Sequence, residues 1–380
     1  MARTPLRPDD PTRIGHYRLT ARLGSGGMGV VYLGISWDGA PVAVKVLRPE
    51  LAGDEEFRRR FGREVAALVQ VKGVCTVRVI EADSQSARPF VVTEYAEGPS
   101  LSEYIDRSGP VAPDMLFGLA TGLAEALTTI HAVGIMHRDL KPSNIILTDG
   151  GPKVIDFGIA RRQDTTAVTR TGMMIGSIGF MAPEQISGHP GPEADIFAWG
   201  VTVAYAAAAR SPFGAGNTHS VLYRIMYGDA DIASVPDSLL PLVEASLAKD
   251  PQNRPTARQL LDRLTSASSR AGKADDTTQV ILARTWQSGS HASPPSAGRP
   301  AAASAVTDAP TADAPTADAP SPVLPAGAVP SAAVPSAAAP APAAPAPEKV
   351  PVARRMATIA TSALVAMRLR RPGRPDEPKS

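Results

Sequence analysis

The chain has 380 residues, with 39 Lys and Arg against 37 Asp and Glu, a formal net charge of +2. This near-neutral balance gives no broad basic field for nucleic acid, so we expect no nucleic-acid partner. The one cysteine, Cys75, excludes a disulfide framework or a cysteine-based metal site within one chain.

Residues 1–13 form an N-terminal extension, polar and rich in proline, without the apolar run of a signal peptide. We therefore expect a cytoplasmic protein. Residues 16–47 predict strands, because their apolar runs are short and rich in β-branched residues, and Asp38-Gly39 suits a tight hairpin turn. Residues 54–71 predict a helix with one apolar stripe, and strand-like composition returns over 77–95.

After Gly98 the pattern becomes mostly helical. Residues 113–133 predict a long helix that Gly134 ends, and 135–161 hold short runs broken by charges, as in loops on a rigid base. Further helices are predicted over 193–210 and 239–264. The organisation is a small β-rich lobe, about 14–95, followed by a larger α-rich lobe, about 96–268.

Residues 269–350 are mainly Ala, Pro, Ser and Thr. Such a stretch buries little apolar surface, so we expect a disordered linker, more a spacer than a partner-binding segment. Residues 351–380 form a basic tail around the apolar stretch 356–367. A helix of that length covers about 18 Å, against a hydrocarbon core of about 30 Å, so it should not span a membrane. The alternative is a short amphipathic helix that contacts the inner face of the cell membrane through residues 351–371.

The glycine-rich segment 24–31 is weak evidence when taken alone, because a plain Gly-rich turn is as frequent. A dinucleotide-binding fold would need a helix directly after the glycines and an acid about 20 positions further on. Here a strand follows, and Lys45 stands near the position of that acid. The glycines therefore predict a hairpin whose backbone covers phosphates.

Lys45 lies on a strand-like run, and Glu64 lies on the apolar stripe of the predicted helix 54–71. A carboxylate facing inward needs a cation, which makes Lys45 the expected partner of Glu64. The alternative for Lys45 is a lysine at a strand edge whose amine reaches solvent.

Three further motifs follow in order: His137-Arg138-Asp139 with Asn144, then Asp156-Phe157-Gly158, then Ala182-Pro183-Glu184. With the glycine loop and Lys45, they resemble the eukaryotic-like (Hanks-type) serine/threonine protein kinases of bacteria, in the style of actinobacteria. The resemblance implies an α+β, bilobal protein kinase fold over residues 14–268, followed by the tail.

The resemblance also implies roles. Asp139 is expected to be the catalytic base and Lys141 to neutralise the γ-phosphate, while Asn144 and Asp156 hold Mg²⁺, for which Mn²⁺ is a substitute. Lys45, fixed by Glu64, would hold the α- and β-phosphates. The expected ATP contacts are Leu23, Gly24, Ser25, Gly26, Gly27, Gly29, Val31, Ala43, Lys45, Glu94 and Ala96. Thr93 would be a small gatekeeper.

In the family, an arginine such as Arg138 receives a phosphate from the activation loop. Thr169 and Thr171 are the expected autophosphorylation sites, the alternative being ordinary loop residues. Glu184 is expected to pair with Arg254, and Asp195 to brace the catalytic loop. Proteins with Ser or Thr are the expected substrates, and homodimers through the small lobe occur among similar kinases.

Two alternatives oppose an active kinase. One is a pseudokinase scaffold, which usually lacks the phosphate lysine, the catalytic Asp or the metal Asp, all of which stand here as Lys45, Asp139 and Asp156. The other is an adaptor that acts through its proline-rich tail.

Overall fold

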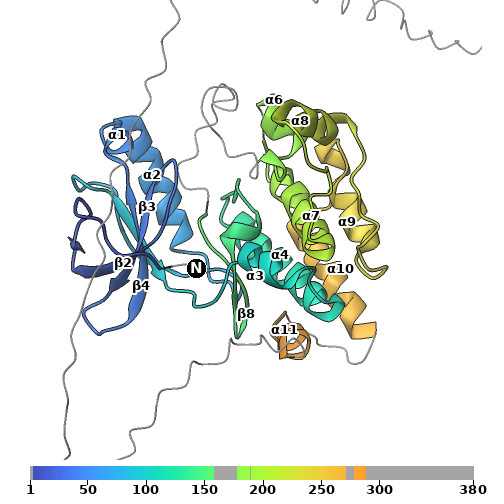
Figure 1. Cartoon of the computed structure of the whole chain (residues 1–380), viewed down its shortest axis with the longest axis horizontal. Helices are drawn as coiled ribbons and strands as arrows, with labels where there is room; N and C mark the ends of the chain where they lie inside the picture. The colour runs from blue at the N-terminus through green and yellow to red at the C-terminus, as the bar shows by residue number, and fades with distance from the viewer. Residues whose placement is uncertain (1–2, 158–177, 189, 271–277, 288–380) are drawn as a thin grey trace, which may run out of the picture. The chain divides into compact units, whose positions relative to one another are not determined.

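The computed structural model describes residues 3–157, 178–188, 190–270 and 278–287. Figure 1 shows a β-sheet with one long helix at its side, followed by a group of helices. This arrangement is the two-lobed fold that the sequence predicts, and both lobes belong to one compact unit.

The small lobe is one antiparallel sheet with strand order β1-β2-β3-β4-β6-β5. Its strands are β1 (Arg13–Ile14), β2 (Tyr17–Ser25), β3 (Gly29–Ile35), β4 (Pro41–Leu47), β5 (Val79–Asp83) and β6 (Phe90–Glu94). The predicted turn between β3 and β4 is confirmed, since Gly39 has φ +84° and the Ser36 amide donates to Ala40 O at 3.0 Å.

The helices of the small lobe follow β4. They are α1 (Pro49–Ala52) and α2 (Glu55–Leu68). Asp54 caps α2 by accepting a hydrogen bond from Phe57 N at 3.0 Å. The predicted stripe is confirmed, because Phe57, Phe61, Val65 and Leu68 are buried in one cluster with Phe157. Glu64 lies between two of these positions, so the packing of α2 fixes where its carboxylate lies.

The large lobe is built around α4 (Pro113–Ala132), which Gly134 follows with φ +75°, as predicted. Among the described residues, α4 is the one helix long and apolar enough to cross a membrane, and 67% of its most apolar window is buried in the protein core. The other elements are α3 (Leu101–Ser108), η1 (Pro142–Asn144), β7 (Ile145–Thr148), β8 (Gly151–Val154), α6 (Pro183–Ser187), α7 (Glu193–Ala208), α8 (Thr218–Tyr227), α9 (Leu240–Ser246), η3 (Pro251–Asn253), α10 (Ala257–Arg270) and α11 (Thr278–Gln287).

Two predictions about the helices are wrong. The continuous helix over 239–264 is broken into α9, η3 and α10, because Pro251 and Pro255 remove backbone donors and clash with the preceding turn. The linker 269–350 is not wholly without structure, since α11 packs against α4 and β8 with Ile281, Leu282 and Trp286 buried. The rest of the tail, from 288, lies outside the described residues.

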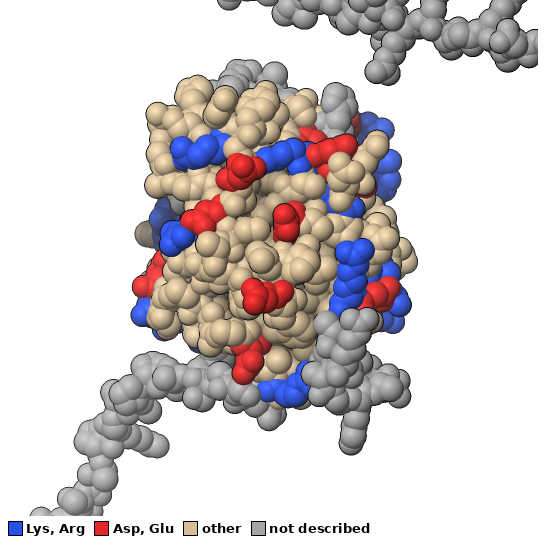
Figure 2. Space-filling view, turned by 90° about the vertical axis from the view of Figure 1, so that its right-hand side faces the viewer, with Lys and Arg blue, Asp and Glu red and all other residues tan. Residues whose placement is uncertain are grey.

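Figure 2 views the face on the large-lobe side of the molecule. Lys and Arg are interspersed there with Asp and Glu among uncharged residues, and no continuous basic field covers this face. The arrangement agrees with the near-neutral net charge of +2.

Candidate active site

Asp195, near the start of α7, braces the loop that carries Asp139, as predicted. Its buried carboxylate accepts hydrogen bonds from His137 N at 2.8 Å, Arg138 N at 2.7 Å and His131 Nε2 at 2.8 Å. Arg138 has φ +62°, a conformation that costs a non-glycine residue free energy. The hydrogen bonds from the His137 and Arg138 amides to Asp195 hold Arg138 in this conformation. No role was predicted for His131. A histidine at the end of a predicted core helix was the signal that could have indicated one.

The charge state of Asp195 follows from its partners. Burial alone would raise the pKa of this carboxyl, but the hydrogen bond and charge of His131, together with His137, outweigh burial and hold the pKa below its usual value. Asp195 is therefore ionised at neutral pH. His137 is fully buried, and burial lowers the pKa of its imidazole, so this ring is neutral.

The polar side chains of the catalytic loop form one network around Asp139. Lys141 Nζ donates to Asp139 Oδ2 at 2.9 Å, and Asn144 Nδ2 donates to Asp139 O at 2.8 Å and Oδ2 at 3.3 Å. Ile155 N donates to Asn144 O at 2.9 Å, which brings Asn144 next to the segment that carries Asp156. The structure thus gathers the three predicted residues of this loop at one place and sets Asp156 beside them.

Lys45 of β4 pairs with Asp156, which follows β8. Asp156 has φ +61°, while the next residue, Phe157, is buried in the cluster of α2 and meets the His137 ring edge-on, with centroids 6.1 Å apart. Burial of Phe157 fixes the neighbouring carboxylate toward Lys45. An amine from the small lobe and a carboxylate from the large lobe therefore converge, as the sequence predicts.

The predicted ion pair between Lys45 and Glu64 is wrong for this structure. Among the described residues, Lys45 pairs with Asp156, and the Glu64 carboxylate lies 3.7 Å from Arg138 Nη1. The physical reason is that the amine of Lys45 meets the acid of the large lobe, while the carboxylate of Glu64 faces the guanidinium of Arg138. Glu64 nevertheless faces the site, with a side chain 17% exposed.

Asn144 and Asp156 suit Mg²⁺, because both carry the hard oxygen that this ion prefers. The amide nitrogen of Asn144 is used by Asp139, so its Oδ1 is the end turned to other partners. Among the described residues, no group of three or more His, Cys, Asp or Glu could hold a metal. Two protein ligands suffice for a magnesium ion that also binds phosphates and water.

The glycine-rich hairpin also fits a phosphate ligand. A Cβ at Gly24, Gly26 or Gly27 would meet no atom within 4 Å, and none of these residues has a positive φ. Neither packing nor backbone geometry within the protein therefore requires glycine at these positions. Close approach of a ligand to the backbone would account for glycine at these positions. Gly29 differs, because a Cβ there would lie 2.1 Å from Val46 O.

The predicted hinge lies at the end of β6. Thr93 of β6 pairs with Ala43 of β4. In the β3–β4 ladder, Ala43 pairs with Leu33, and Lys45 pairs with Val31. The predicted ATP contacts Val31, Ala43 and Lys45 therefore lie in the same part of the sheet as Thr93. The Glu94 amide donates to Arg78 O at 2.9 Å. Any bond from the Glu94 backbone to a purine must therefore use its carbonyl.

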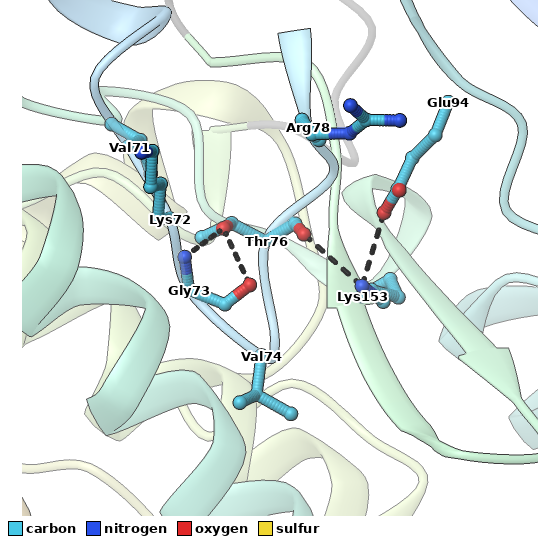
Figure 3. Close-up of a pocket in the computed structure, with 8 residues that line it drawn as sticks. All are labelled: Val71, Lys72, Gly73, Val74, Thr76, Arg78, Glu94 and Lys153. Atoms are coloured by element: carbon cyan, nitrogen blue, oxygen red, sulfur yellow. Dashed lines mark hydrogen bonds and ion pairs between the residues drawn. The ribbon is translucent and has the colours of Figure 1, made fainter.

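A pocket of about 290 Å³ lies beside this hinge and is lined by Val71, Lys72, Gly73, Val74, Thr76, Arg78, Glu94 and Lys153 (Figure 3). Of the predicted ATP contacts it includes Glu94 alone, so it differs from the predicted nucleotide site. Figure 3 shows Lys153 of β8 donating to Glu94 Oε1 at 3.0 Å and to Thr76 O at 3.2 Å. Lys153 thus ties the hinge to the large lobe, a role that sequence analysis missed.

The predicted pair of Glu184 and Arg254 is confirmed as a buried bidentate pair, with N–O distances of 2.6 and 3.0 Å. Arg254 also donates to Ala248 O and Glu193 O, so it joins α6, α7 and η3. The predicted phosphorylation sites Thr169 and Thr171, and Gly158, lie outside the described residues.

Comparisons with known proteins agree with this geometry. A family model described as the protein kinase domain matches residues 17–264. A probable serine/threonine-protein kinase, PkwA of Thermomonospora curvata, is 46% identical over 263 residues, which are 69% of this chain and 35% of that protein. The serine/threonine-protein kinase AfsK of Streptomyces coelicolor is 39% identical over 275 residues, 72% of this chain and 34% of its own.

The chain thus spans about a third of the length of these relatives. Among solved structures, the PknI kinase domain of Mycobacterium tuberculosis matches with a TM-score of 0.53 and 26% identity. That match covers 67% of this chain and 97% of the other.

Proposed function

Because the chain belongs to the protein kinase family, we propose that it transfers the γ-phosphate of ATP to serine or threonine hydroxyls of proteins, itself included, in bacterial signalling. The observation that carries this proposal is the convergence of Lys45 and Asp156 beside the network of Asp139, Lys141 and Asn144. No observation favours the scaffold or adaptor alternatives.

The roles of the residues follow from their chemistry. Asn144 and Asp156 would hold Mg²⁺, and Lys45 would hold phosphate oxygens after leaving Asp156. When bound, Mg²⁺ supplies positive charge that offsets the charge of the phosphates. Asp139 would orient the acceptor hydroxyl and take its proton, while the new bond from that oxygen to phosphorus forms and the bond from phosphorus to the ADP oxygen breaks. Lys141, 2.9 Å from Asp139, would stabilise the transferred group.

Regulation belongs to the same proposal. Phosphate on Thr169 or Thr171 would bring nearly two negative charges, for which Arg138 is the cation nearest to the catalytic base in sequence. The small-lobe dimer, the cytoplasmic location and the membrane contact through residues 351–371 stay predictions.

The test is phosphate transfer by the purified full chain with labelled ATP and Mg²⁺, followed by phosphoamino acid analysis of the chain and of a generic acceptor. We expect phosphoserine or phosphothreonine from the wild type and a loss of at least about a thousandfold in Asp139→Asn. Asp149→Asn, an exposed aspartate on the β7–β8 turn, is the matched control and should keep full activity. Equal activity of Asp139→Asn and wild type would refute the proposal.

A further inference from the structure

Residues 3–10, here called the strap, lie against the root of the glycine-rich hairpin. Thr4 pairs with Arg22 of β2 through two backbone hydrogen bonds, Thr4 N to Arg22 O at 3.0 Å and Arg22 N to Thr4 O at 2.8 Å. Leu6 packs against the buried cluster of the sheet. The strand β1 consists of Arg13 and Ile14 and pairs with the start of β2. Nearer to the hairpin, Thr4 supplies the backbone pairing on this edge of the sheet.

Asp10, at the end of the strap, binds the side chains of Arg22 and Tyr32, close to the backbone pairing of Thr4 with Arg22. Arg22 donates to it twice, from Nε at 2.6 Å and Nη2 at 2.7 Å, and Tyr32 Oη donates at 2.8 Å. The Arg7 amide adds a bond at 2.8 Å, which closes a turn that presents the carboxylate. The side chains of Asp10 and Arg22 are 5% and 15% exposed, so this pair is largely shielded from water.

The position of this contact in the hairpin is specific. Arg22 and Tyr32 are directly opposite each other, and an irregularity in the ladder between Arg22 and Gly24 follows at once. Asp10 therefore clamps the last regular cross-strand pair before the glycines. Leu23, one of the predicted ATP contacts, is the extra residue at this irregularity, directly after the clamped pair.

The other end of the strap reaches the hinge. Arg3 Nη2 donates to Tyr95 Oη at 3.2 Å and to Glu97 Oε1 at 3.3 Å, and its guanidinium lies 5.3 Å from the Tyr95 ring centroid. These groups are exposed, so this contact is weaker than that of Asp10. The strap nevertheless connects the two elements that would hold the phosphates and the adenine.

We propose that the strap sets the position of the glycine-rich hairpin relative to the hinge and that Asp10 is thereby a positioning residue for nucleotide binding. The inference rests on the proposed function, because it takes the hairpin and the hinge as nucleotide-binding elements. Loosening the hairpin weakens contacts made equally in the ground state and the transition state. In the part of the chain that the structure describes, no hydrogen bond or ion pair joins residues 3–10 to the large-lobe residues that would perform the chemistry, so KM for ATP should change and kcat should not.

The test compares Asp10→Asn with Asp9→Asn, which removes the same charge from an exposed neighbour. Each full-length variant is measured for kcat, for KM of ATP, for the affinity of a fluorescent ATP analogue with Mg²⁺, and for hydrogen exchange of the peptide 17–35 without nucleotide. We expect Asp10→Asn to raise KM and the dissociation constant about threefold to tenfold, with kcat within about twofold. Exchange in the hairpin should rise, and Asp9→Asn should match the wild type. Asp10→Glu should recover part of the affinity.

Two results would overturn the inference. The first is unchanged exchange in Asp10→Asn, which would mean that the strap does not hold the hairpin. The second is faster exchange with unchanged affinity for the ATP analogue, or a fall in kcat that accompanies a fall in thermal stability. Either form would give Asp10 a purely structural role. If the wild type itself transfers no phosphate, the proposed function fails. Hydrogen exchange and binding of the ATP analogue would still test whether the strap positions the hairpin.

Discussion

The carboxylate of Glu64 on α2 lies 3.7 Å from the guanidinium of Arg138, whereas Lys45 pairs with Asp156. Two acids and two cations thus meet at the junction of the lobes in a combination that differs from the expected one. Nucleotide phosphates and an activation-loop phosphate would each compete for one of the cations, Lys45 and Arg138 respectively. A shift of Glu64 from Arg138 to Lys45 with both phosphates in place is then an outcome that kinetics can test.

The first prediction concerns this exchange of partners. Phosphatase treatment should lower the activity of the wild type about tenfold, because Arg138 then retains Glu64, and Arg138→Gln should respond much less. Glu64→Gln should be slow in both states, since α2 then offers no carboxylate to Lys45 once Asp156 binds Mg²⁺. The measurement is kcat/KM before and after phosphatase, with exposed Arg63→Gln and Glu56→Gln as matched controls. A full phosphatase response in Arg138→Gln would contradict the exchange.

The second prediction concerns Asp156. Asp156→Asn removes the partner of Lys45 and a charged oxygen for Mg²⁺, so phosphate transfer should fall at least about a thousandfold. Nucleotide affinity should also lose its dependence on Mg²⁺. Titration with an ATP analogue, with the metal present and with it chelated, measures this directly. If Asp156→Asn keeps the wild-type gain from Mg²⁺, the metal is held elsewhere.

The sequence was sufficient for what depends on local pattern. Lys45 on a strand, the stripe of α2 and the end of α4 at Gly134 follow from periodicity and glycine, and the structure has each of them. The partner of Glu64 could not be predicted, because spacing says that a carboxylate faces inward but not which of two nearby cations it meets. Asp10 was equally hidden, since an acid in a proline-rich extension predicts only solvent exposure.

The helix α11 was missed for a different reason. The composition of residues 269–350 is dominated by small residues and proline, which outweighed the local signal of Ile281, Leu282 and Trp286 at helical spacing. A tryptophan in such a tail was the available warning, since a large aromatic side chain is rarely left without a packing surface. The helix α11 packs closely on Gly118 and Gly151, where an added Cβ would lie 2.3 Å from Thr285 Oγ1 and 3.1 Å from Leu282 Cδ1.

The third prediction concerns pH. The folded state lowers the pKa of Asp195, so its stabilising effect is complete above the unfolded value of 3.8 and is lost as pH falls through the folded value. Asp195→Asn should therefore lower the free energy of unfolding by about 2–4 kcal/mol at neutral pH, because three donors lose a charged acceptor. Urea denaturation should show a constant difference from pH 8 to about 5 and a smaller one below about pH 4. A difference that grows on acidification would contradict this account.

The last prediction concerns the end of the folded domain. The family match ends at residue 264, yet Trp286 Nε1 donates to Thr148 O at 2.7 Å, and the Trp286 side chain is buried against the large lobe. Because β8 leads directly to Asp156, α11 supports the strand that positions this carboxylate. We expect a chain ending at residue 287 to keep the stability and activity of the full chain, whereas one ending at 270 loses about 2–4 kcal/mol of unfolding free energy.

Trp286→Ala in the full chain should reproduce most of the loss caused by ending the chain at 270, but no more, since the substitution removes one side chain of α11 and the truncation removes all of its contacts. Val280→Ala, on the exposed side of the same helix at 46% exposure, should stay within about 0.5 kcal/mol of the wild type. Urea denaturation of the full chain, the two shortened chains and the two substituted chains measures these differences. Equal stability of the chains ending at 270 and 287 would show that α11 contributes nothing to the fold, and the domain would then end with α10.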